Sequence, residues 1–382
     1  MNISISVNSK AHRIAVSAFF FLAGLTMASW ASRIPDIKEK LELSEAGLGA
    51  VLFALPVGQL LSLPLAGFLI QKFSSRNIVI AAAVMLPLAL LSLAVTASVT
   101  QLVAALILFG VFANLINISM NTQAVGVEKM YGRSIMASFH GLWSLAGFTG
   151  AALGSFFVSA HIAPVIHFAI ICAVTALITL GAYKYALPGE YDEKTSQPLW
   201  VKPDKSILTL GIIALCCMIC EGAMADWSGV YFQKVVEAPA AFTTAGYVAF
   251  MATMAMGRFF GDALVTKFGV KRILQTSGVL IASGLLTMIT LPYTASAIAG
   301  CLLVGIGVSC VVPVAFGLAR KSKTMSPSLA LAAVSTIGFL GFLAGPPLIG
   351  FIAQITNLQW SFAAIAALGL GTTLMAGRIK NA

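Results

Sequence analysis

Five charged side chains lie within or at the ends of long apolar stretches, and their types could do chemistry there. Glu221 and Asp226 share one apolar stretch, Arg258 and Asp262 lie four residues apart in the next, and Arg33 ends the first. A carboxylate in an apolar setting can take up and release a proton. A charge placed there is costly and indicates a function. Glu221 and Asp226 are therefore predicted to carry a proton.

The same charges allow gating and plain structural interpretations. Arg33 ends the first stretch, and Asp226 lies toward the matching end of its own stretch. The two are predicted to form an external gate pair in the inward-facing state, although two separate interfacial charges are the alternative. Arg258 and Asp262 share one helix face and can pair locally. That pair is predicted to lock the inner side, with a structural ion pair as the alternative. For Glu221, the alternative is a hydrogen bond that braces two helices.

Three amides form the best signal for a polar ligand. Asn114, Asn117 and Asn121 follow i, i+3, i+7 spacing, which puts them on one stripe of a helix. Carboxamides offer both donors and acceptors, so the stripe is predicted to bind a polar or hydroxylated solute. Hydrogen bonding between helices is the alternative.

Two tryptophans and one histidine complete the candidate binding residues. Trp30 and Trp227 occupy matching positions in the two halves of the chain, next to the predicted gate charges. They are predicted either to contact solute or to serve as interfacial aromatics. His140 can change its charge near neutral pH, and a satisfied structural histidine is its alternative.

The elements that must position these residues are membrane-spanning helices. Hydrophobic residues make up 59% of the chain and charged residues 9%, against roughly 45–50% and 25% in soluble domains. Apolar stretches of about 20 residues, each long enough to cross a bilayer core, are predicted at 13–32, 47–70, 78–97, 101–125, 135–159, 163–183, 207–232, 242–265, 273–292, 294–319, 328–353 and 358–377. Eighteen of the 23 Lys and Arg residues fall on one side of these spans. By the positive-inside rule, both termini are predicted to be cytoplasmic.

The chain is predicted to be a duplication. A six-span half at 1–187 is followed by a polar linker at 188–206 and a second half at 207–382. Met27-Ala28-Ser29-Trp30 matches Met224-Ala225-Asp226-Trp227, and Lys72-Phe73-Ser74 matches Lys267-Phe268-Gly269. Such repeats place a solute site between the halves, reached alternately from each side. The expected fold class is an all-α membrane protein with twelve transmembrane helices in two pseudo-symmetric halves.

Several short motifs resemble the YbjJ-like branch of the major facilitator superfamily. They are Ala28-Ser29-Trp30-Ala31-Ser32-Arg33-Ile34-Pro35, Met120-Asn121-x-Gln123, Ser138-Phe139-His140, Asp226-Trp227-Ser228, and Gly257-Arg258 with Gly261-Asp262. The resemblance covers nearly the whole chain and implies the major facilitator fold and a transport function. Asn117 stands where the branch tends to carry an acidic residue, so the resemblance gives that position no proton role.

These features predict a secondary active transporter that works by alternating access and couples protons to a small polar solute of the sugar or sugar-acid type. Proton-driven efflux of a drug or amphipathic metabolite is the alternative, favoured by the apolar remainder with 14 Met and 24 Phe. No phosphate-loop, Gly-x-Ser-x-Gly or metal-spaced motif is present, so an enzyme, a metal site and a cofactor are not expected. The net charge of +10 is assigned to cytoplasmic loops rather than to nucleic-acid binding. The expected partners are solute, protons and lipid, for a monomer in a bacterial inner membrane.

Overall fold

The computed structural model describes residues 7–132, 135–188, 203–322 and 324–379, and these form helices and turns without a β-strand. Eleven stretches in this part of the chain are long and apolar enough to cross a membrane. One of them, Glu45–Val95, has 51 residues, about twice what one crossing needs. Its backbone leaves the helical region at Ser74. That stretch therefore holds two crossings, and the predicted total of twelve is confirmed.

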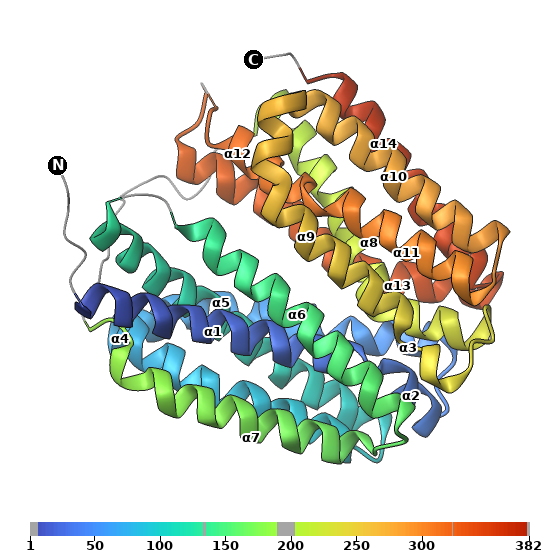
Figure 1. The fold of residues 1–382 in the computed structure, drawn as a ribbon, viewed down its shortest axis with the longest axis horizontal. Coiled ribbons are helices and arrows are strands. Elements are labelled where there is room, and N and C mark those ends of the chain that lie inside the picture. The colour runs from blue at the N-terminus through green and yellow to red at the C-terminus, as the bar shows by residue number, and fades with distance from the viewer. Residues whose placement is uncertain (1–6, 133–134, 189–202, 323, 380–382) are drawn as a thin grey trace. The chain divides into compact units, whose positions relative to one another are not determined.

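The first compact unit comprises residues 1–41 and 54–194. In this unit α4 packs along α5, α1 packs along α6, and α7 lies against both α4 and α1. The helices are α1 (Val7–Ala31), α2 (Ile34–Lys40), α4 (Ala54–Val95), α5 (Val99–Tyr131), α6 (Met136–Ser159), α7 (Pro164–Ala182) and the short 3-10 helix η1 (Tyr183–Tyr185) (Figure 1).

The second compact unit comprises residues 42–53 and 195–382. In this unit α8 packs on α13, α9 packs on α11, and α10 lies between α11 and α14. The helices are α3 (Glu45–Leu52), α8 (Lys205–Lys234), the 3-10 helix η2 (Ala240–Phe242), α9 (Ala245–Phe268), α10 (Val270–Thr290), α11 (Thr294–Ser309), α12 (Val311–Ala319), α13 (Pro327–Ile355) and α14 (Leu358–Gly377) (Figure 1).

The internal repeat is visible in the backbone. The two matching Lys-Phe-x segments end at Ser74, with φ 71° and ψ 152°, and at Gly269, with φ 81° and ψ 152°. Glu42 and Glu237 also share a φ of 51°. Positive φ is uncommon outside glycine. Its recurrence at matching places therefore supports the duplication read from the sequence.

One short helix lies in an unexpected place. By sequence α3 opens the second span of the first half, yet it packs on α13 and belongs to the second compact unit. Most of the predicted linker 188–206 lies outside the described residues. The domain boundaries at 187 and 207 stay a prediction.

Candidate functional site

A partly buried ion pair joins α8 and α9. Oε1 of Glu221 accepts a hydrogen bond from Nη2 of Arg258 across 3.4 Å. The two side chains are 15% and 17% exposed. Both residues lie in the middle part of apolar helices, where an unpaired charge would be costly. The two charges therefore compensate each other within the second unit.

Two further polar side chains continue this group along the α8–α9 interface. Asp226 is half-buried and lies five residues beyond Glu221. Tyr247 of α9 is buried and lies within electrostatic range of both carboxyl groups. Among the described residues, no hydrogen bond reaches the Asp226 carboxylate. Glu221 is paired with Arg258, whereas Asp226 has no cationic partner among the described residues, so a proton on Asp226 would leave the group uncharged.

A second polar cluster surrounds Arg33 in the first unit. This side chain is 1% exposed and uses all three of its nitrogens. Nε donates to Nδ1 of His167 (3.2 Å), Nη1 donates to Asp36 (3.2 Å), and Nη2 donates to the carbonyl of Ile162 (2.7 Å). Because an arginine can only donate, the Nδ1 atom of His167 must accept, and that ring carries its proton on Nε2. The cluster ties the α1–α2 turn to the start of α7.

Burial dominates the electrostatics of the Arg33 cluster. Desolvation raises the pKa of the Asp36 carboxyl, although the neighbouring Arg33 charge and hydrogen bond oppose this shift. Desolvation also lowers the pKa of Arg33, again against the opposing effect of Asp36. His167 is fully buried and its ring lies against Phe157 with centroids 4.7 Å apart. The Arg33 guanidinium is thus held by neutral and anionic acceptors in a tightly packed setting.

The predicted gate residues fall into different groups. The described partners of Arg33 all lie in the first unit, whereas Asp226 belongs to the second, so the Arg33–Asp226 pair stays a prediction. The structure describes the helical backbone of Asp262, but its side chain lies outside what is described. Its predicted pairing with Arg258 is likewise untested. Among the described side chains, Arg258 pairs with Glu221.

Sequence reasoning missed two of these partners. Opposite charges in consecutive apolar spans were a usable signal for Glu221 with Arg258, since each buried charge needs a partner. The contact between His167 and Arg33 was harder to predict. The two residues are 134 positions apart, and a lone histidine at the start of an apolar span gives no indication of which residue it contacts.

The three amides of α5 differ in exposure. Asn114 is buried, and its Nδ2 donates to Oγ of Ser62 on α4 across 2.7 Å. Asn117 is exposed. Asn121 donates to the Asn117 carbonyl (2.8 Å) and to its Oδ1 (3.1 Å). The geometry of Asn114 is that of the interhelical alternative, while Asn117 and Asn121 keep polar atoms at the surface of the unit.

Both tryptophans are core residues of their own units. Trp30 is 2% exposed and Trp227 is 0% exposed. Neither indole Nε1 has a hydrogen-bond partner among the described residues. Burial of this degree differs from that of an interfacial aromatic, which keeps its polar end in water. His140 is exposed and meets the edge of the Phe20 ring, with centroids 5.2 Å apart.

The fold and these charged groups define a multi-pass helical membrane protein with partly buried ion pairs in both of its repeated halves. The family model of the Major Facilitator Superfamily matches residues 14–326. An uncharacterised MFS-type transporter of Yersinia pestis is 34% identical over 93% of this chain and 92% of the relative. Membrane protein MosC of Rhizobium meliloti is 30% identical over 93% of this chain and 87% of the relative. This chain belongs to the Major Facilitator Superfamily and is a transporter rather than an enzyme.

Solved structures share the fold. A bacterial homologue of the human lysosomal transporter Spinster, in an inward-facing and occupied conformation, gives a TM-score of 0.77 at 12% identity, with 98% of each chain covered. The D-xylose-proton symporter gives 0.76 at 13% identity and covers 97% of this chain and 98% of that chain. The nucleoside transporter NupG gives 0.72 at 13% identity, covering 98% and 100%. The structural likeness establishes the twelve-helix architecture. At sequence identities this low it does not indicate the solute, which has to be argued from the site.

Proposed function

We propose that this transporter couples protons to the movement of a small, polar, anionic solute of the sugar-acid type across the bacterial inner membrane by alternating access. The observation that supports it is the partly buried Glu221–Arg258 pair between α8 and α9. A carboxylate and a guanidinium 3.4 Å apart form a group whose charge changes with one proton.

The charges supply a coupling mechanism. While Glu221 is ionised, it occupies the Arg258 guanidinium and neutralises it. Protonation of Glu221 removes that neutralisation and leaves Arg258 to bind another anion. Arginine forms two parallel hydrogen bonds with a carboxylate, which suits a sugar acid. Loss of the proton restores the internal pair and weakens the hold on the solute. Proton and anion therefore bind together and leave together.

The remaining predicted residues have supporting roles in this proposal. Asn117 and Asn121 are proposed to bind hydroxyl groups of the solute, since amides donate and accept. Asp226 is proposed as a second proton-binding group, with Tyr247 within electrostatic range of both carboxylates. Arg33, Arg258 and Asp262 keep their predicted gating roles. The termini are proposed to be cytoplasmic and the working form to be a monomer.

A ligand screen on the purified protein tests this function. Ligands that bind the folded state raise its apparent stability. We would compare sugar acids, neutral sugars, nucleosides and amphipathic cations at one acidic and one alkaline pH. We expect sugar acids to give the largest stabilisation, and we expect this stabilisation to be larger at acidic than at alkaline pH.

Variants make the screen decisive. Arg258→Gln should abolish stabilisation by sugar acids, whereas Arg378→Gln on the exposed C-terminal turn should leave it unchanged. Equal stabilisation by neutral and acidic sugars would show that the negative charge is not recognised, and the proposed solute would then be a neutral sugar. Stabilisation by amphipathic cations alone would overturn the proposal in favour of proton-driven efflux of a drug or amphipathic metabolite.

A further inference from the structure

A cavity of about 210 Å³ opens in the second unit between α9 and α12. It lies beside a break between two helices. α9 packs closely on α11, where a Cβ atom at Gly257 would collide with Oγ of Ser309. The α11 helix ends at Ser309, and after Cys310 the chain continues as α12. Beyond that break, a Cβ atom at Gly317 would meet nothing within 4 Å. The two helices have diverged.

The core of the unit explains why α12 turns away from α9. Ala315 and Ala319 of α12 are fully buried in a cluster with Ile207 and Leu210 of α8, and α13 completes it. Burial of that face fixes the orientation of α12. Its other face, with Gly317, is left as a wall of the cavity.

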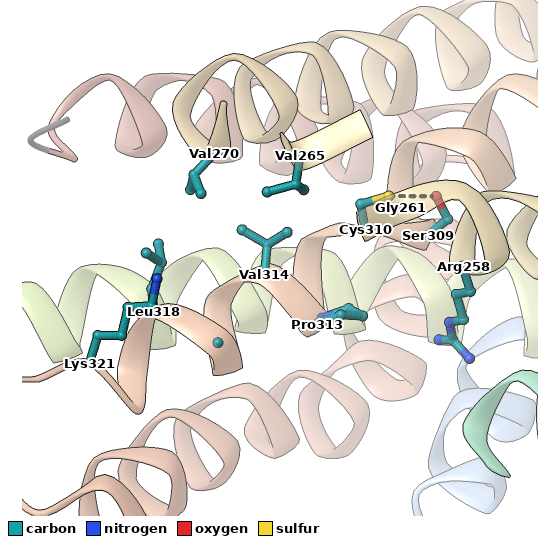
Figure 2. Close-up of a pocket in the computed structure, with 11 residues that line it drawn as sticks. Arg258, Gly261, Val265, Val270, Ser309, Cys310, Pro313, Val314, Leu318 and Lys321 are labelled. Atoms are coloured by element: carbon teal, nitrogen blue, oxygen red, sulfur yellow. Dashed lines mark hydrogen bonds between the residues drawn. The ribbon is translucent and has the colours of Figure 1, made fainter. Parts of the chain in front are cut away.

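The lining has the character of a lipid-binding crevice. Arg258 and Lys321 lie at its two ends (Figure 2). Between them, Figure 2 shows apolar side chains from both walls, with Val265 and Val314 facing each other. None of the eleven lining residues with described side chains is acidic, and the side chain of Asp262, which follows Gly261, lies outside what is described. The volume is far above the 10–15 Å³ or so that one water needs, and an elongated apolar space of this kind fits a hydrocarbon chain.

The mouth near Lys321 is basic. Lys271 and Arg272 follow Val270, which lines the cavity, in the first turn of α10, and Arg320 precedes Lys321. The described side chains give these four residues no acidic partner within salt-bridge distance. All four lie at the ends of spans that the positive-inside rule predicts to be cytoplasmic. The cytoplasmic leaflet is anionic, and basic pockets between helices on that side bind acidic headgroups.

We propose that this cavity binds an anionic phospholipid, with one acyl chain between Val265, Val314 and Leu318 and the headgroup phosphate at Lys321 and Lys271. The two features of the site require each other. A free phosphate would gain nothing from the apolar walls, and an uncharged lipid would gain nothing from the basic mouth. A chain in this space fills the gap left by the divergence of α9 and α12, so it braces α12 beside the Glu221–Arg258 pair.

The test compares three probes on the purified full-length protein in a non-ionic detergent. They are phosphatidylglycerol, phosphatidylcholine with the same acyl chains, and glycerol phosphate. Binding is measured by native mass spectrometry and by the shift of the unfolding temperature. We expect phosphatidylglycerol to bind and stabilise, phosphatidylcholine to do so at least about fivefold more weakly, and glycerol phosphate to have no effect.

Two variants with matched controls locate the site. Gly317→Leu fills the cavity and should abolish the preference for phosphatidylglycerol, whereas Gly371→Leu on α14, where a Cβ atom also meets nothing within 4 Å, should retain it. Lys321→Gln should weaken binding by about fivefold, the effect of one lysine at an anionic surface. Lys205→Gln, at the exposed start of α8, should not.

Three outcomes would overturn the proposal. Equal binding of the two lipids would show that charge is not recognised. Stabilisation by glycerol phosphate equal to that by phosphatidylglycerol would reveal a site for free phosphate. A Gly317→Leu protein that keeps the same lipid preference as Gly371→Leu would place the lipid outside the cavity.

Discussion

Gly350 of α13 and Gly49 of α3 lie backbone against backbone, so that a Cβ atom at Gly350 would lie 3.0 Å from Cα of Gly49 and 2.6 Å from the carbonyl oxygen of Glu45. Beside this contact, Nζ of Lys234 donates to Oε1 of Glu45 across 2.8 Å. Small residues permit such close packing of helices in membranes. This contact and the ion pair hold α3 within the second compact unit.

Replacement of Gly350 by alanine should disrupt the packing of α3. The added methyl group would meet backbone atoms, which cannot move aside as a flexible side chain can, so we expect a loss of about 1–3 kcal/mol, the usual cost of overpacking. The unfolding temperature of the purified protein measures it. Gly371→Ala is the matched control because its Cβ atom would meet nothing. Similar unfolding temperatures for the two variants would contradict the observed contact.

The equivalent turns of the repeat should respond in opposite directions to substitution. Ser74 and Gly269 share nearly the same positive-φ conformation, which costs a non-glycine residue about 1–3 kcal/mol. Ser74→Gly should therefore raise the unfolding temperature, and Gly269→Ala should lower it. No steric effect complicates the second variant, since a Cβ atom at Gly269 would lie in open space. Destabilisation by Ser74→Gly would refute the assigned strain.

The fold was accessible from sequence because the bilayer restricts the possible structures. Only helices satisfy every backbone group in hydrocarbon, so hydropathy alone located the twelve spans, and short repeated motifs identified the two halves. The break at Cys310 and the docking of α3 on α13 were not accessible. Both depend on which faces pack together, and spans that are apolar on all sides give little indication of this.

The candidate site was predicted at the level of residue types and missed at the level of partners. Glu221, Arg258 and Arg33 were identified because buried charges are rare and costly. Their observed partners are set by tertiary packing: Arg258 reaches across to Glu221, and Arg33 reaches His167 on α7. Local spacing directed attention to residues four apart on one helix, and contacts over 37 and 134 positions lay beyond its reach.

Substitution of Arg33 by lysine should destabilise the first unit despite the conserved charge. Lysine cannot reproduce the three donors that reach His167, Asp36 and the Ile162 carbonyl. Loss of a buried partner costs about 3–5 kcal/mol, and we expect about 2–3 kcal/mol here because the Asp36 side chain is 34% exposed. The unfolding temperature should fall for Arg33→Lys and stay constant for Arg378→Lys. Tolerance of Arg33→Lys would mean that charge alone is required.

The N-cap of α8 should give a stability contribution that depends on pH. Oδ1 of Asp204 accepts from the Ile207 N–H across 2.8 Å, and its other oxygen accepts from the Thr324 hydroxyl. Chiefly through the bond from Thr324, the pKa of Asp204 lies below its ordinary value. A lowered carboxyl pKa contributes stability above the ordinary value, and that stability is lost as the pH falls through the lowered pKa.

Asp204→Ala and Asp204→Asn separate the charge from the cap. Alanine removes the acceptor and should cost about 1 kcal/mol at neutral pH. Asparagine retains an acceptor, so its loss should be smaller. As the pH is lowered through the acid range, the difference between wild type and Asp204→Ala should shrink, while the difference between the two variants should stay nearly constant. Unfolding temperatures across that range measure both, and a wild-type advantage that grows in acid would contradict the sign of the shift.

Glu221→Gln separates proton coupling from solute movement. Glutamine has the shape of the protonated side chain and cannot release a proton, so Arg258 would remain available to an anionic solute at every pH. Once a stabilising solute is identified, exchange of labelled for unlabelled solute in proteoliposomes should persist in Glu221→Gln, while accumulation driven by a proton gradient should be lost.

Gln233→Glu, with a carboxyl group near the far end of the same helix, controls for a general change of charge on α8. If Glu221→Gln still accumulates solute under a proton gradient, another residue must carry the coupling proton, and Asp226 would be the next residue to replace. Loss of exchange as well would mean that Glu221 is needed for solute binding or for reorientation of the loaded carrier, because exchange does not require the empty carrier to return.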